Sequence, residues 1–125
     1  MLKVVSTDKA PAAIGPYSQA IVVGDFLFSS GQIPLDAVSG EVVGTTIEEQ
    51  AEQVMKNISA VLADQGIAFT DVIKTTCFLA DMGDFAKFNE IYAKYFTGNP
   101  ARSCVAVKQL PKNVLCEVEF IASLK

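Results

Sequence analysis

The stretch that decides the fold of this chain is AIVVGDFLFS, residues 20–29. It consists of two runs of β-branched, aliphatic and aromatic residues on either side of Gly24-Asp25. A Gly-Asp pair readily adopts the positive φ angles of a tight turn, and such a pair between two apolar runs is typical of a β-hairpin. The sequence therefore predicts two antiparallel strands here, and a sheet to which other segments add.

Two segments that follow this hairpin have helical periodicity. Residues 45–49 read TTIEE, which places a threonine three residues ahead of a glutamate in either register and predicts a capping-box start. From Ile47 to Leu62 the apolar residues recur at i, i+3, i+4 and i+7, and Gly66 is placed to end the helix. The polar residues of this helix, Asn57 among them, take the opposite side. A second helix carries an apolar face from Phe85 to Tyr95, and we expect it to close near Gly98, before Pro100.

Three further segments are rich in residues that favour strands, namely 72–79, 102–107 and 114–123. The resulting order is hairpin, helix, strand, helix, strand, strand. This order predicts an α+β domain in which both helices pack on one face of a mixed sheet.

The last of these strands carries apolar residues on both faces. Its even-numbered positions from Cys116 to Ala122 point to one face, while Leu115 and Ile121 add apolar bulk to the face of Glu117 and Glu119. Two helices cover only one side of a sheet. We therefore expect the second apolar face to meet another subunit.

Composition excludes several classes of protein. The chain has 125 residues, half of them apolar, which is enough for one compact domain over residues 1–125. The net charge is −4 and the lysines are scattered, so the electrostatic pattern of a nucleic-acid-binding protein is missing. No apolar run is long enough for a signal peptide or a membrane span, and we expect a cytoplasmic protein.

The residue types also limit the chemistry. The chain has no histidine, and its three cysteines, Cys77, Cys104 and Cys116, form no C-x-x-C pair. Neither a metal site nor a disulfide framework is indicated, and Ser-His and Cys-His nucleophiles are excluded. Catalysis has to use carboxylate, arginine and backbone groups.

Arg102 is the only arginine in the chain, against nine lysines. It stands at the entrance of an apolar run, and its planar guanidinium matches a carboxylate. The alternative is a surface ion pair, which typically contributes about 0–1 kcal/mol. Side chains alternate along a strand, so Arg102 and Cys104 share a face, and we expect Glu117 on the neighbouring final strand to approach them. We place the Tyr17 loop on the facing surface of a neighbouring subunit.

Each candidate residue also has a plainer structural interpretation. Glu117 could be an exposed strand position, and Cys104 a small buried residue rather than a nucleophile. Tyr17 could fill the edge of the core, and Asn89 could be an ordinary polar position on the second helix. Ser30 stands next to a glycine, where serines are usually turn residues.

Four blocks, in order along the chain, carry a family resemblance. They are AAIGPYSQA at residues 12–20, SSGQIP at 29–34, PARSCV at 100–105 and CEVE at 116–119. Together they resemble the RidA/YjgF family over essentially the whole chain, and the reactive imine and enamine deaminases within it. The resemblance implies a chorismate-mutase-like fold, related to the ferredoxin-like fold, with a mixed six-stranded sheet and two helices on one face. It also implies a homotrimer with three clefts between subunits.

The activity implied by this resemblance is hydrolysis of 2-imino acids, such as 2-iminopropanoate and 2-iminobutanoate, to 2-keto acids and ammonia without a cofactor. By the same resemblance Arg102 binds the substrate carboxylate and Glu117 positions the attacking water. The implied pocket positions are Tyr17, Ser30, Gly31, Asn89 and Cys104, the last largely through its backbone. A protonated imine carbon is already electrophilic, so an arginine and one carboxylate can suffice.

Two other functions compete with the deaminase interpretation. In the first, the same clefts hold a 2-keto acid without turnover, and the trimer acts as a sensor or regulator. In the second, the protein is a ribonuclease or translation inhibitor, activities that have been attached to relatives of this family. The acidic balance and the lack of a basic aromatic stripe count against nucleic acid as a partner.

Overall fold

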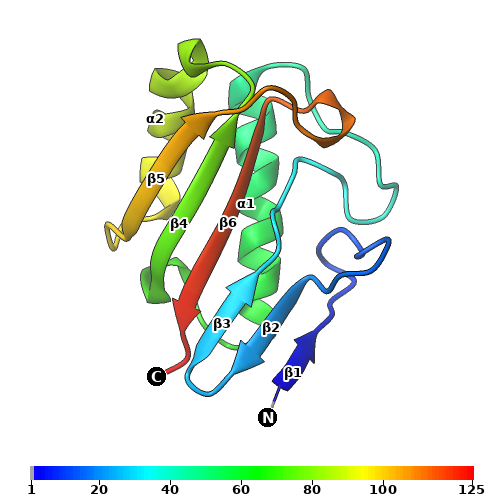
Figure 1. The fold of residues 1–125 in the computed structure, drawn as a ribbon, viewed down its shortest axis with the longest axis vertical. Coiled ribbons are helices and arrows are strands. Elements are labelled where there is room, and N and C mark those ends of the chain that lie inside the picture. Colours follow the sequence, from blue (N-terminus) through cyan, green and yellow to red (C-terminus); the bar gives the residue numbers. More distant parts are fainter. Residues whose placement is uncertain (1) are drawn as a thin grey trace.

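The computed structural model describes residues 2–125, which form one six-stranded sheet and two α-helices (Figure 1). The strands are β1 (Leu2–Val5), β2 (Ala20–Val23), β3 (Phe26–Ser29), β4 (Val72–Leu79), β5 (Ala101–Ala106) and β6 (Cys116–Ser123). The helices are α1 (Ile47–Asp64) and α2 (Phe85–Tyr95), with short 3-10 turns at Phe69–Asp71, Met82–Asp84 and Pro111–Asn113. Within residues 2–125, no helix combines the length and the apolar character needed to cross a membrane.

The strands lie across the sheet in the order β1-β2-β3-β6-β4-β5. All neighbours are antiparallel except β4 and β5, which are connected through α2 and run parallel. A parallel pair needs such a crossover, and here it leaves β5 at the edge while β6 enters between β3 and β4. The predicted fold, a mixed six-stranded sheet with both helices on one face, is confirmed. The residue pattern by itself did not assign β1.

Local sequence signals account for the ends of the main elements. The hairpin of β2 and β3 has the predicted bounds, and Gly24 takes a φ of +58° in its turn. Thr46 caps α1: its Oγ1 accepts the Glu49 N–H at 3.2 Å, while the Glu49 carboxylate accepts the Thr46 N–H at 3.2 Å. Gly66, with a φ of +70°, stands just beyond the last turn of α1.

The two faces of the sheet have different environments. Both helices lie behind the sheet in Figure 1, and the side of β6 that faces them, including Cys116, Val118 and Phe120, is at most 2% exposed. On the other side Phe28 and Val105 are 43% and 47% exposed. One apolar face is therefore packed in the core and the other is open.

Asn57 corrects one detail of the predicted helix pattern. The residue pattern predicts Asn57 on the exposed polar side of α1, but it is 1% exposed. Its Nδ2 donates to the carbonyls of Ile33 and Leu35, each at 3.0 Å. The segment after β3 lies against this side of α1, and Asn57 donates to two of its part-buried carbonyls, so a polar helix position is a buried anchor.

Candidate functional site

Arg102 lies on β5 and points toward α2. Its Cζ is 4.7 Å from the ring centroid of Tyr92 and 5.5 Å from that of Phe85, and its Nη1 donates to Asn89 Oδ1 at 2.6 Å. Both ion pairs found in residues 2–125 involve lysines, so the guanidinium has no carboxylate partner in the described part of the chain. Within residues 2–125, Arg102 therefore does not form the surface ion pair of the alternative interpretation. Its guanidinium can bind an anion instead.

The surroundings of Arg102 form a depression beside α2. This cavity of about 420 Å³ is lined by Asn89, Tyr92, Ala93, Phe96, Asn99, Pro100 and Arg102. Beneath it the Tyr92 and Thr75 hydroxyls are hydrogen-bonded at 2.7 Å. We call Asn89, Tyr92, Arg102 and Cys104 the Arg102 cluster.

Cys104 shares the face of Arg102, as predicted from strand alternation. Burial raises the pKa of its thiol, against the opposing effect of the Arg102 charge. In register with it on β4, burial raises the pKa of Cys77 to about 12. Both thiols are therefore protonated at neutral pH, when a thiol is a poor nucleophile. This supports the interpretation of Cys104 as a packing residue.

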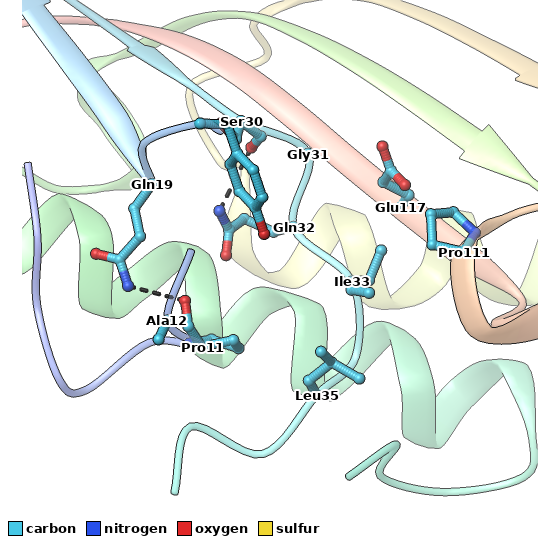
Figure 2. Close-up of a pocket in the computed structure, with 11 residues that line it drawn as sticks. Pro11, Ala12, Gln19, Ser30, Gly31, Gln32, Ile33, Leu35, Pro111 and Glu117 are labelled. Carbon is cyan, nitrogen blue, oxygen red and sulfur yellow. Dashed lines mark hydrogen bonds between the residues drawn. The ribbon is translucent and has the colours of Figure 1, made fainter. Parts of the chain in front are cut away.

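Glu117 lies on β6 in a different cavity, of about 490 Å³ (Figure 2). Its lining residues are Pro11, Ala12, Tyr17, Gln19, Ser30, Gly31, Gln32, Ile33, Leu35, Pro111 and Glu117. The carboxylate stands directly over Gly31: a Cβ at position 31 would collide with Glu117 Oε2 and lie 2.7 Å from Cδ. A glycine at position 31 gives the Glu117 carboxylate room for this close approach. We call Tyr17, Ser30, Gly31 and Glu117 the Glu117 cluster.

Two polar side chains shape the wall around Glu117. The Ser30 hydroxyl donates to the Ser18 carbonyl at 2.5 Å, which leaves its lone pairs as acceptors. Gln19 accepts from the Thr7 N–H at 2.7 Å and donates to the Pro11 carbonyl at 2.8 Å, so it holds the N-terminal loop against the cavity. Gln19 belongs to the AAIGPYSQA segment, but no sequence signal marks it as a site residue, because a sequence does not show which amide is buried.

The protonation of Glu117 is shifted by its surroundings. Burial raises the pKa of its carboxyl group above the ordinary 4.5, and the nearby Glu119 charge adds to the effect. Both influences disfavour the charged form. A carboxylate whose pKa is raised in this way is a stronger base than an exposed one.

The structure contradicts the expectation that Glu117 approaches Arg102 within one chain. Strand β4 lies between β5 and β6. Arg102 is in register with the buried Thr75, whereas Glu117 is in register with Phe78, three residues further along β4. Residues three apart point to opposite faces of a strand, so the two side chains lie on opposite sides of the sheet. Tyr17 lies beside Glu117 in one cavity, which also corrects its placement opposite a joint Arg102 and Glu117 surface.

The order of strands explains this error. The last two strands follow each other in the sequence, and this is why they are expected to be neighbours. The α2 crossover instead puts β5 beyond β4, and β6 pairs with the other side of β4. As for metals, no three of the Cys, Asp and Glu side chains in the described range 2–125 are grouped to hold an ion.

Comparison with known proteins gives consistent matches along the chain. The family model described as Endoribonuclease L-PSP matches residues 7–124. A Lactococcus lactis protein, provisionally named regulator AldR, is 56% identical over 125 residues, covering 99% of each chain. The 2-iminobutanoate/2-iminopropanoate deaminase of Rattus norvegicus is 50% identical over 121 residues, covering 96% of this chain and 88% of the rat protein.

Among solved structures, E. coli TdcF with bound serine superposes with a TM-score of 0.91 at 41% identity, covering 97% of this chain and 98% of TdcF. A match of this extent relates the whole fold and not a single motif.

Proposed function

This chain belongs to the YjgF/RutC/RidA family, and from that premise we propose that it hydrolyses 2-imino acids to 2-keto acids and ammonia. The observation that carries the proposal is the half-buried Glu117 carboxylate, which stands over Gly31 in a cavity whose other polar wall includes Ser30. A base held at a cavity wall is the group that water addition to an imine needs. A rat relative named as a 2-iminobutanoate/2-iminopropanoate deaminase supports this activity.

Arg102 supplies the second requirement, a fixed site for the substrate carboxylate. It has no carboxylate partner among residues 2–125, and only one of its hydrogen bonds goes to a side chain of the protein, Asn89. A guanidinium binds a carboxylate through two parallel N–H···O bonds. The serine bound to TdcF is an amino acid, and a 2-imino acid shares its α-carboxylate and α-nitrogen.

The reaction proceeds in two stages. Glu117 takes a proton from water as the water oxygen bonds to the iminium carbon, which gives a tetrahedral carbinolamine. The protonated Glu117 then returns its proton to the amine nitrogen. The C–N bond breaks as the hydroxyl oxygen becomes the carbonyl, and the hydroxyl proton passes to the Glu117 carboxylate and from there to the departing ammonia. The enzyme holds the substrate and the water in place and needs no covalent intermediate.

Arg102 and Glu117 lie on opposite sides of the sheet, so one chain cannot present both to one substrate. We propose that the site is completed between copies in a homotrimer: the Glu117 cluster of one subunit faces the Arg102 cluster of the next. The open sheet face supports this assembly, because Phe26, Phe28 and Val105 on it are 43–47% exposed. In a closed ring each contact joins two different surfaces, which suits clusters on different faces.

The test is turnover of a 2-imino acid generated in solution by an amino acid oxidase. We expect the protein to accelerate keto acid and ammonia release well beyond the spontaneous rate. An unchanged rate with a folded protein would exclude the activity.

A second candidate function is a trimer that binds 2-keto acids without turnover and regulates a partner, which the name of the Lactococcus relative favours. The same clefts would bind the ligand. Saturable binding of a 2-keto acid without imine hydrolysis would identify this function. The family description as an endoribonuclease calls for a nuclease assay, without added metal, on extensively purified protein.

A further inference from the structure

We propose that helix α2 immobilises the Arg102 guanidinium before any ligand binds, with Phe85, Asn89 and Tyr92 as positioning residues for carboxylate binding. This proposal deepens the proposed function and rests on it only in naming the ligand as a small carboxylate. The order of the Arg102 side chain itself can be measured without any substrate.

The three contacts come from one stripe of α2. Positions 85, 89 and 92 are spaced i, i+4 and i+7, which places them on the same face of a helix. Phe85 and Tyr92 are two turns apart, or about 10.5 Å along the axis. The guanidinium carbon is 5.5 Å from the first ring and 4.7 Å from the second, so it occupies the interval between them, beside Asn89.

Tyr92 is itself held rigidly. Its hydroxyl is hydrogen-bonded to Thr75 at 2.7 Å, and its ring stacks on that of Phe96 with centroids 4.4 Å apart. Thr75 is 0% exposed and lies in register with Arg102 on the adjacent strand. The Tyr92 ring that contacts the guanidinium is therefore fixed by its hydrogen bond to Thr75 on β4 and by its stacking on Phe96.

All of the groups that hold Arg102 are neutral. The two rings attract the cation through their faces, and the Asn89 amide oxygen accepts one N–H. An acidic residue in place of Asn89 would form an ion pair and compete with a ligand carboxylate. Phe85, Asn89 and Tyr92, which we call the α2 clamp, thus restrict the motion of the Arg102 side chain. They leave its full charge and its other N–H donors free for the ligand. Since arginine has high rotamer entropy, ordering it in advance lowers the cost of binding.

The chain offers an unusually clean measurement, because Arg102 is its only arginine. In ¹⁵N NMR of the intact, ligand-free protein, the single arginine Nε–Hε signal reports on this side chain alone. We expect an order parameter near the roughly 0.85 of rigid backbone in the wild type, falling below about 0.6 in Tyr92→Leu. Tyr92→Phe keeps the ring and should retain most of the order. Lys87→Ala, at an exposed position of the same helix, is the matched control and should behave as the wild type.

Asn89→Ala and Phe85→Leu test the clamp at half-buried positions if Tyr92→Leu fails to fold. Each should lower the order parameter and raise the KM for a 2-imino acid, or the Kd for pyruvate, about tenfold. At saturating substrate, kcat should change much less, because the bound substrate carboxylate orders the Arg102 side chain again. A merely structural role would lower stability without this separation of KM from kcat.

A mobile Arg102 in the ligand-free wild type would overturn the proposal, and so would folded variants with unchanged order. Loss of order in the variants, in a protein that hydrolyses no imine, would leave the clamp standing and remove the deaminase function instead. The two failures are therefore distinguishable.

Discussion

Two inactive variants of this chain should regain activity together when their subunits exchange. The first is Arg102→Ala, which removes the carboxylate-binding fork, and the second is Glu117→Gln, which removes the base. Within a chain the two side chains lie on opposite sides of the sheet, with β4 between their strands. If each cleft takes Arg102 from one copy and Glu117 from the next, a mixed trimer contains clefts in which both are intact.

The magnitude of the recovery follows from this geometry. In a closed ring every contact is heterologous, so an intact cleft requires an Arg102→Ala subunit to supply Glu117 and a Glu117→Gln subunit to supply Arg102. Equal amounts of the two variants and random exchange place the two subunits in this order in about one quarter of the clefts. Averaged over all clefts, we therefore expect the mixture to reach about 25% of the wild-type rate, although each parent alone has almost no activity.

The assay is release of ammonia and pyruvate from 2-iminopropanoate generated by an amino acid oxidase, with exchange verified by native mass spectrometry. The control is a mixture of Tyr17→Ala and Glu117→Gln, whose substituted residues line one cavity and hence the same side of the cleft. This control mixture should stay at the average rate of its two parents. No recovery for the Arg102→Ala and Glu117→Gln pair after full exchange would refute the shared site. A monomer by light scattering at micromolar concentration would refute the trimer itself.

Further substitutions test the individual groups. Arg102→Lys keeps the charge but loses bidentate geometry, so kcat/KM should fall by roughly 10- to 100-fold; a near-normal value in the folded protein would contradict the clamp of the carboxylate. Gly31→Ala should lower kcat by about 100-fold with little change in Tm, because the new Cβ pushes aside only the flexible end of Glu117. An unaltered kcat would show that this position of the carboxylate does not matter for the reaction. Glu117→Gln should slow hydrolysis by about 100-fold or more while pyruvate binding persists. Burial raises the pKa of Glu117, so folding favours its protonated form, and this contribution to stability is lost as the pH rises above about 4.5. Glu117→Gln should therefore have the higher Tm at pH 7, with the difference shrinking toward pH 4, and an equal difference at both pH values would contradict this sign. Cys104→Ser should have a mild effect, and loss of turnover in this variant but not in Glu117→Gln would reverse the two roles.

Local signals in the sequence determined most of the elements of this protein. The Gly24-Asp25 turn, the Thr46 cap and the apolar stripe of α1 depend on neighbours a few residues away, and the structure has each of them where the pattern predicts. The sequence also shows that Arg102 is the only arginine and that there is no histidine, and these two facts favour carboxylate and guanidinium chemistry.

Only the tertiary structure decided how these residues are brought together. Periodicity tells which residues of a strand share a face, but the order of strands in a sheet depends on long-range crossovers that leave no local trace. Because the crossover through α2 put β4 between Arg102 and Glu117, the two expected partners lie on opposite sides of the sheet. The same holds for Asn57 and Gln19, whose amides are buried because distant segments pack against them and their backbone carbonyls accept the amide N–H groups.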